Sequence, residues 1–165
     1  MVNVITESDM DFIADNSFHI EKSSTYKKLS KQGIRSVEFI RAKDDKFLFV
    51  EAKTTFPNPN NPSVENLEKF RSEINEICDK FIHSLNLFSA VKVGVAENSF
   101  PDDFVPPEKA SLQFILVIQN HKIKWCKPIK ETLTATLPSY LKKIWKPDVY
   151  VTNHAGAGKY NLTVS

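Results

Sequence analysis

Apolar side chains recur at steps of three and four residues between Val64 and Leu85, which is the period of an α-helix. Ser63, just before this segment, is of a residue type that commonly caps a helix N-terminus. The apolar positions are Val64, Leu67, Phe70, Ile74, Ile77, Phe81, Ile82 and Leu85, and the opposite side carries Glu65, Glu68, Lys69, Glu73, Glu76 and Lys80. The pattern predicts an amphipathic helix of about six turns that packs against the protein by one face.

Runs of β-branched and aromatic residues predict the strands. Two strands, over residues 34–43 and 46–55, flank the turn-forming sequence KDDK. Residues 111–120 form a nearly continuous apolar run, which is typical of a strand buried on both faces of a sheet. Shorter strands are expected over 90–95 and 148–152.

Polar segments and helix breakers separate these elements. A helix over 22–32 is expected to end at Gly33, and a helix over 128–145 should be split or kinked by Pro138. Residues 1–16 are expected to form a loose arm or a short helix, and residues 153–165 a polar tail. The order of elements predicts a single α/β domain over 1–165, with helices flanking a mixed central β-sheet.

Composition and charge exclude several classes of protein. The chain has 165 residues, 41% hydrophobic and 25% charged, which argues against a collagen-like or wholly disordered protein. No apolar run is long enough to span a bilayer, and the N-terminus carries acids where a secretory signal is basic, so we expect a cytoplasmic protein without membrane contact. Cys78 and Cys126 match no metal or redox spacing and are expected to be free thiols.

The predicted hairpin allows its register to be calculated. If Asp44 and Asp45 form the turn, Lys43 pairs with Lys46, and the same register pairs Glu38 with Glu51. Directly paired residues project to the same side of a sheet, and Lys53 projects there too because side chains alternate along a strand. One face of the hairpin should therefore carry Glu38, Glu51 and Lys53 together.

Two neighbouring carboxylates on a partly apolar face repel each other and need a compensating charge. Carboxylate oxygens are suitable ligands for Mg²⁺ or Mn²⁺, and a nearby lysine could orient a metal-bound water or a phosphoryl oxygen. Metal-assisted hydrolysis of a phosphodiester is one interpretation of Glu38, Glu51 and Lys53. The other is that all three are solvated side chains on an exposed face.

The sequence Glu51-Ala52-Lys53 ends an apolar strand, and an acid precedes it by 13 residues on the partner strand. This arrangement resembles the PD-(D/E)xK nuclease superfamily. The resemblance implies a restriction-endonuclease-like fold and a metal-dependent nuclease that uses Mg²⁺ or Mn²⁺ and acts on DNA or RNA, with DNA favoured. It also allows a homodimer, although no residue pattern identifies an interface.

The resemblance assigns a role to each residue of the motif. Glu38 and Glu51 are the expected metal ligands, together with the backbone carbonyl of Ala52, and Lys53 is the expected catalytic lysine. Glu21, which precedes these strands, is a candidate third carboxylate, but an acid near a helix N-terminus is also favoured by the helix dipole.

A second functional class stays open, namely a catalytically inactive module of the same fold that binds nucleic acid or a protein partner. Clustered basic residues such as Lys27, Lys28 and Lys31 could follow a phosphate backbone, but solvated helix faces explain them equally simply. Lys80 is interpreted as the ion-pair partner of Glu76 one turn earlier, with a phosphate contact as the alternative.

Overall fold

A computed structural model describes residues 1–164 and contains a five-stranded sheet in the order β3-β4-β5-β6-β7. Strands β3, β4 and β5 run antiparallel, whereas β5, β6 and β7 run parallel. Their bounds are Ser17–Phe18, Phe39–Lys43, Lys46–Lys53, Ser111–Ile118 and Asp148–Asn153. The predicted class, a mixed α/β fold with helices beside a central sheet, is confirmed.

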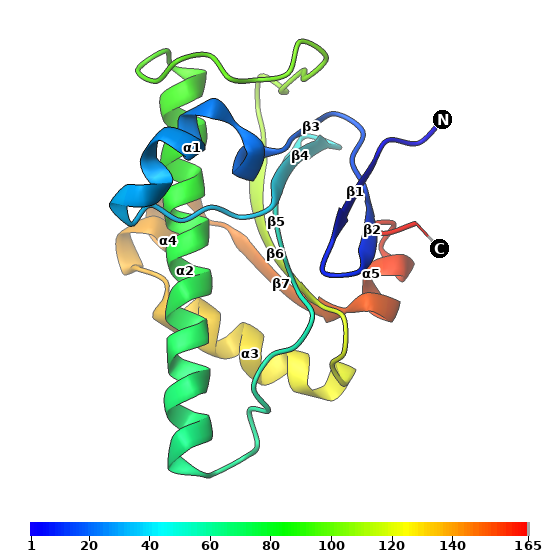
Figure 1. Cartoon of the computed structure of the whole chain (residues 1–165), viewed down its shortest axis with the longest axis vertical. Helices are drawn as coiled ribbons and strands as arrows, with labels where there is room; N and C mark the ends of the chain where they lie inside the picture. Colours follow the sequence, from blue (N-terminus) through cyan, green and yellow to red (C-terminus); the bar gives the residue numbers. More distant parts are fainter. Residues whose placement is uncertain (165) are drawn as a thin grey trace.

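Helices cover one face of the sheet. Helix α2 (Val64–Lys92) runs across this face, together with α1 (Ser24–Leu29), α3 (Ile123–Thr136) and α4 (Ser139–Trp145) (Figure 1). The other face is covered by the hairpin β1 (Val4–Glu7) and β2 (Met10–Ile13) and by α5 (His154–Lys159). A separate hydrophobic core forms on each face of the sheet.

The β4–β5 hairpin has the predicted register from the turn as far as Phe39. Lys43 pairs with Lys46 and Phe39 with Val50. Asp44 and Asp45 have φ of 50° and 56°, as a two-residue turn with the right-handed strand twist requires. Residues 34–38 are not part of the strand, which begins only at Phe39.

Helix α2 begins as predicted but is longer. The Ser63 hydroxyl accepts a hydrogen bond from the Asn66 amide and caps the helix. The strand predicted over 90–95 is wrong, because the apolar stripe of α2 continues through the buried side chains of Phe88 and Val91. The helix ends before Gly94, whose φ is 80°.

The two ends of the chain also differ from the prediction. Residues 4–13 form a β-hairpin that buries Met10 and Phe12, in place of a loose arm or a short helix. The C-terminal segment contains α5 and the buried residue Leu162, and Thr163 bridges to Phe12. The helix predicted over 128–145 starts earlier, at Ile123, and is divided at Pro138 as expected.

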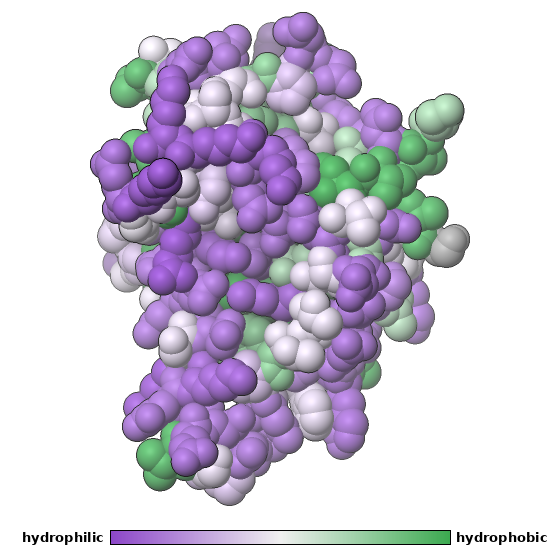
Figure 2. All heavy atoms as spheres, in the orientation of Figure 1, coloured by the Kyte–Doolittle hydropathy of each residue, from purple (hydrophilic) through white to green (hydrophobic). Residues whose placement is uncertain are grey.

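The exterior that faces the viewer is mostly hydrophilic over α1 and α2, and a hydrophobic area lies near the N-terminus (Figure 2). Cys78 and Cys126 are free and buried, and they lie in α2 and α3. Among residues 1–164, no helix has both the length and the apolarity needed to cross a membrane.

Candidate active site

Glu51 is an acidic residue at a fully buried position of strand β5. Its neighbours Val50 and Ala52 point to the hairpin side, so Glu51 points to the α2 side, and its exposed fraction is 0%. Its Oε1 atom lies 2.5 Å from Nζ of Lys80 on α2. Its Oε2 atom is buried and has no hydrogen-bond partner among residues 1–164.

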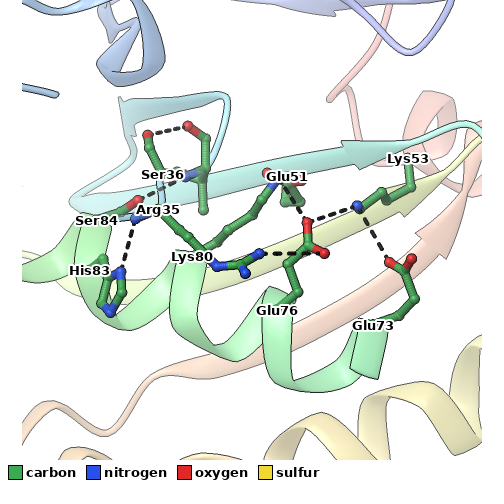
Figure 3. Close-up of polar contacts among 10 residues, drawn as sticks. Arg35, Ser36, Glu51, Lys53, Glu73, Glu76, Lys80, His83 and Ser84 are labelled. Carbon is green, nitrogen blue, oxygen red and sulfur yellow. Dashed lines mark hydrogen bonds and ion pairs between the residues drawn. The ribbon is translucent and has the colours of Figure 1, made fainter. Parts of the chain in front are cut away.

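Lys53 lies on the same side of β5, at the carboxyl end of the strand. Its Nζ atom is 3.4 Å from Glu73 and 3.4 Å from Glu76, both on α2 (Figure 3). Glu76 also contacts Lys80 at 3.9 Å and Arg35 at 3.5 Å. The ion pair predicted between Glu76 and Lys80 is therefore present, but Glu51 is the closer partner of Lys80.

Glu38 lies just before β4, where the hairpin register changes by one residue. Its amide donates to the carbonyl of Val50 at 3.0 Å, and Val50 is already paired with Phe39. Two residues thus stand opposite one, as in a β-bulge, and the predicted direct pairing of Glu38 with Glu51 is not formed. The two carboxyl groups are nevertheless close enough for Glu51 to raise the pKa of Glu38.

Glu21 reaches the same place from the short 3₁₀ turn Ile20–Lys22, which follows β3. Its amide donates to the carbonyl of Glu38 at 3.5 Å. The Glu21 side chain lies close enough to that of Glu38 to raise the pKa of the Glu38 carboxyl group. The candidate third carboxylate is thus brought next to the first.

Burial has the largest effect on the pKa values of Glu38 and Glu51. It raises the pKa of Glu38 to about 10, with further contributions from Glu21 and Glu51. Burial also raises the pKa of Glu51, but the positive charge of Lys80 opposes it and leaves the value at about 7. Burial lowers the pKa of Lys80, and the ion pair with Glu51 outweighs it, so that the pKa ends above its ordinary value.

The donor set suits a hard divalent cation. Glu38 and Glu51 each have one buried carboxylate oxygen without a hydrogen-bond partner, and carboxylate oxygens are the ligands that Mg²⁺ and Mn²⁺ prefer. The methyl group of Ala52 packs in the core on the opposite face, between the two site residues of β5. Lys80 already supplies one positive charge beside Glu51.

Sequence reasoning missed Lys80 as a member of the site, because Glu73, Glu76 and Lys80 were assigned to a solvated side of the helix. Their side chains are only 27%, 30% and 18% exposed. The available signal was their spacing of three and four residues, which forms a charged stripe beside the apolar one. Glu7 and His19, which lie near Glu21, were missed because the β1–β2 hairpin was not predicted.

Comparison with protein-family models, with curated proteins and with solved structures finds no match for this chain. A function must therefore be inferred from the fold and from the side chains described above.

Proposed function

We propose that this protein is a metal-dependent nuclease of the PD-(D/E)xK type, which uses Mg²⁺ or Mn²⁺ to hydrolyse phosphodiester bonds in DNA or RNA. DNA is the favoured substrate of the two. One observation carries the proposal. Two buried carboxyl groups, Glu38 and Glu51, lie close together with an unpartnered oxygen each, next to the ammonium groups of Lys53 and Lys80.

Buried acids of this kind need a reason to be retained. Leaving a buried polar group without a hydrogen-bond partner costs about 1–3 kcal/mol of stability. The cost is larger when the buried group is charged. A divalent ion between Glu38 and Glu51 would satisfy both orphan oxygens and return both groups to their charged forms. Glu21 and the carbonyl of Ala52 would complete the protein ligands.

The residues of the site fit distinct tasks in such a reaction. When bound, the metal would polarise the phosphate and lower the pKa of a water molecule. Lys80 opposes the effect of burial on the pKa of Glu51 through their ion pair and so favours the charged carboxylate. Lys53 is 22% exposed at the end of β5, and we assign it the task of orienting a water molecule or stabilising a phosphoryl oxygen.

The position of the site in the sheet also supports the proposal. Lys53 is at the carboxyl end of β5, which is parallel to β6 and β7. Open α/β sheets generally bind ligands outside the carboxyl ends of their parallel strands.

A second candidate function is supported by the ion pair between Lys80 and Glu51. The ammonium group lies where a cation would neutralise Glu51, so the site is partly compensated without a metal. On this interpretation the chain is a catalytically inactive module of the same fold, which binds nucleic acid or a protein partner.

A cleavage assay separates the two candidates. The full chain is incubated with plasmid DNA, single-stranded DNA and RNA, with Mg²⁺, with Mn²⁺ or with EDTA. We expect metal-dependent cleavage that K53A and E51Q each reduce by about 100-fold or more. K46A, at the exposed start of the same strand, is the matched control and should cleave like the wild type.

Wild-type protein that binds these nucleic acids but cleaves none of them with either metal would favour the inactive module. Cleavage that persists in both K53A and E51Q would come from another source and would contradict the proposed site.

A further inference from the structure

A second group of ligand-type side chains lies beside Glu21, on the side of the N-terminal hairpin. Glu7 is the last residue of β1, and His19 directly follows β3. Potential ligand atoms of Glu7, His19 and Glu21 all lie within 4.8 Å of one another. Nε2 of His19 is 3.4 Å from Oε1 of Glu7.

An independent observation indicates that this group is incomplete as it stands. Glu38 is only 8% exposed and lies beside this group, because the Glu21 amide donates a hydrogen bond to the Glu38 carbonyl at 3.5 Å. The charges of Glu7 and Glu21 both raise the pKa of the Glu38 carboxyl group. Its Oε2 atom is shielded from water and has no hydrogen-bond partner. A cation would satisfy a buried carboxylate oxygen of this kind, which lies near two further carboxyl groups.

We infer that Glu7, His19 and Glu21, with Glu38 behind them, form a binding site for a first-row transition-metal ion such as Mn²⁺ or Zn²⁺. Imidazole is a common ligand of these ions, whereas Mg²⁺ is held mainly by carboxylates, phosphates and water. The mixed ligand set of one imidazole and two carboxylates therefore favours the transition metal.

This site is distinct from the proposed centre at Glu51 and Lys53, although it shares Glu21 and Glu38 with it. Binding of the ion does not require hydrolysis, so the inference goes beyond the proposed function. It also gives the N-terminal hairpin a role, because β1 supplies a ligand that neither of the strands bearing Glu38 and Glu51 can provide.

The test uses the full chain carrying E51Q, which disables the other centre. Binding of Mn²⁺ is followed by the loss of the free-ion electron paramagnetic resonance signal. We expect E51Q to bind one Mn²⁺ in the presence of excess Mg²⁺. Adding H19A or E7Q should weaken this binding by roughly tenfold or more, as expected when a metal ligand is lost. H154A, a histidine change outside the group, should not.

Two results would overturn the inference: no Mn²⁺ binding by E51Q under these conditions, or equal binding by E51Q, E51Q/H19A and E51Q/E7Q. Melting curves without metal show whether each variant is folded, and E7Q provides a second measurement if H19A is not. Wild-type cleavage is scored separately, so failure of the nuclease proposal leaves the result for this site unaffected.

Discussion

At the scale of single residues, Glu38 has an environment that is unusual for a carboxyl group. It combines burial with three acidic neighbours, Glu21, Glu51 and Glu7, each of which raises the pKa of its carboxyl group. In the metal-free protein this carboxyl group is therefore neutral at pH 7, because its pKa is about 10. Binding of a divalent ion must release this proton, so metal affinity should rise with pH.

The proton on Glu38 makes stability depend on pH. The pKa is about 10 in the folded protein against an ordinary value of 4.5, so the folded state retains a proton that the unfolded chain loses. This contribution to stability is complete below pH 4.5 and is lost as the pH rises through 10. In EDTA, we expect the free energy of unfolding to fall with rising pH, by at most about 1.4 kcal/mol per pH unit from this group.

Urea titrations between pH 6 and pH 9 measure this slope. E38Q should flatten it and should be more stable than the wild type at pH 9, because glutamine cannot ionise. E108Q, which changes an exposed glutamate, should keep the wild-type slope. An E38Q slope equal to that of the wild type would show that Glu38 is not protonated in the folded state.

At the scale of elements, α2 and the central sheet are joined by both apolar packing and charge. Phe81 of α2 stacks on Phe114 of β6, with ring centroids 4.6 Å apart, and Lys80 reaches the buried carboxylate of Glu51. Packing brings the helix to the sheet, and the Lys80 side chain then compensates a charge that no other described side chain hydrogen-bonds.

Removing Lys80 leaves Glu51 buried without its partner. We expect K80A to lower the free energy of unfolding by about 3 kcal/mol at pH 8, as is typical when one member of a buried ion pair is lost. The loss should be smaller at pH 5, where Glu51, with a pKa of about 7, is already protonated. Urea denaturation at the two pH values measures both quantities.

K69A changes an exposed lysine on the same helix and should alter stability by less than about 0.5 kcal/mol. The double variant E51Q/K80A should be more stable than K80A alone. A K80A effect that is independent of pH would mean that Lys80 contributes by packing and not through the charge of Glu51.

The long elements could be predicted from the sequence because their patterns are local. The period of α2, the apolar run of β6 and the turn at Asp44 each specify their own structure. The β1–β2 hairpin could not be predicted in this way, because Met10 and Phe12 are buried only by contact with distant strands. The strand predicted at 90–95 failed for a related reason, since the sequence AVKVGV fits a strand while the preceding helix simply continues.

In the candidate site, too, local patterns predict some features, whereas others depend on tertiary packing. Glu51 and Lys53 share a face of β5, as alternation along a strand predicts, and Glu21 is near Glu38 as proposed. The irregular pairing at Glu38 and the approach of Lys80 depend on how α2 and the 3₁₀ turn pack, which no local pattern specifies.

At the scale of the whole molecule, two cores are built on opposite faces of one sheet, and the N-terminal hairpin closes the smaller one. Phe12 is fully buried and contacts Phe39 edge to face, with ring centroids 5.6 Å apart. The same hairpin carries Glu7 to His19 and Glu21. Stability of this core and geometry of the acidic group are therefore linked through one element.

Truncating Phe12 tests this link. We expect F12A to lower the free energy of unfolding by about 3–5 kcal/mol, which is typical for a buried phenylalanine, and to weaken Mn²⁺ binding in the E51Q background. V4A, at a position 46% exposed on β1, should change neither quantity appreciably. Unchanged Mn²⁺ binding in a folded F12A protein would show that Glu7 is held in place by something other than hairpin packing.

The two strands that pair with β5 are synthesised at different times. Its antiparallel partner β4 is adjacent in the sequence, but its parallel partner β6 begins only at Ser111, so residues 54–110 must be synthesised first. Until then the growing chain presents a free apolar edge, FLFVEA, of the kind that pairs with other copies. Lys46 and Lys53 flank this stretch. Their positive charges repel the same lysines of another nascent chain, and this repulsion disfavours aggregation during translation.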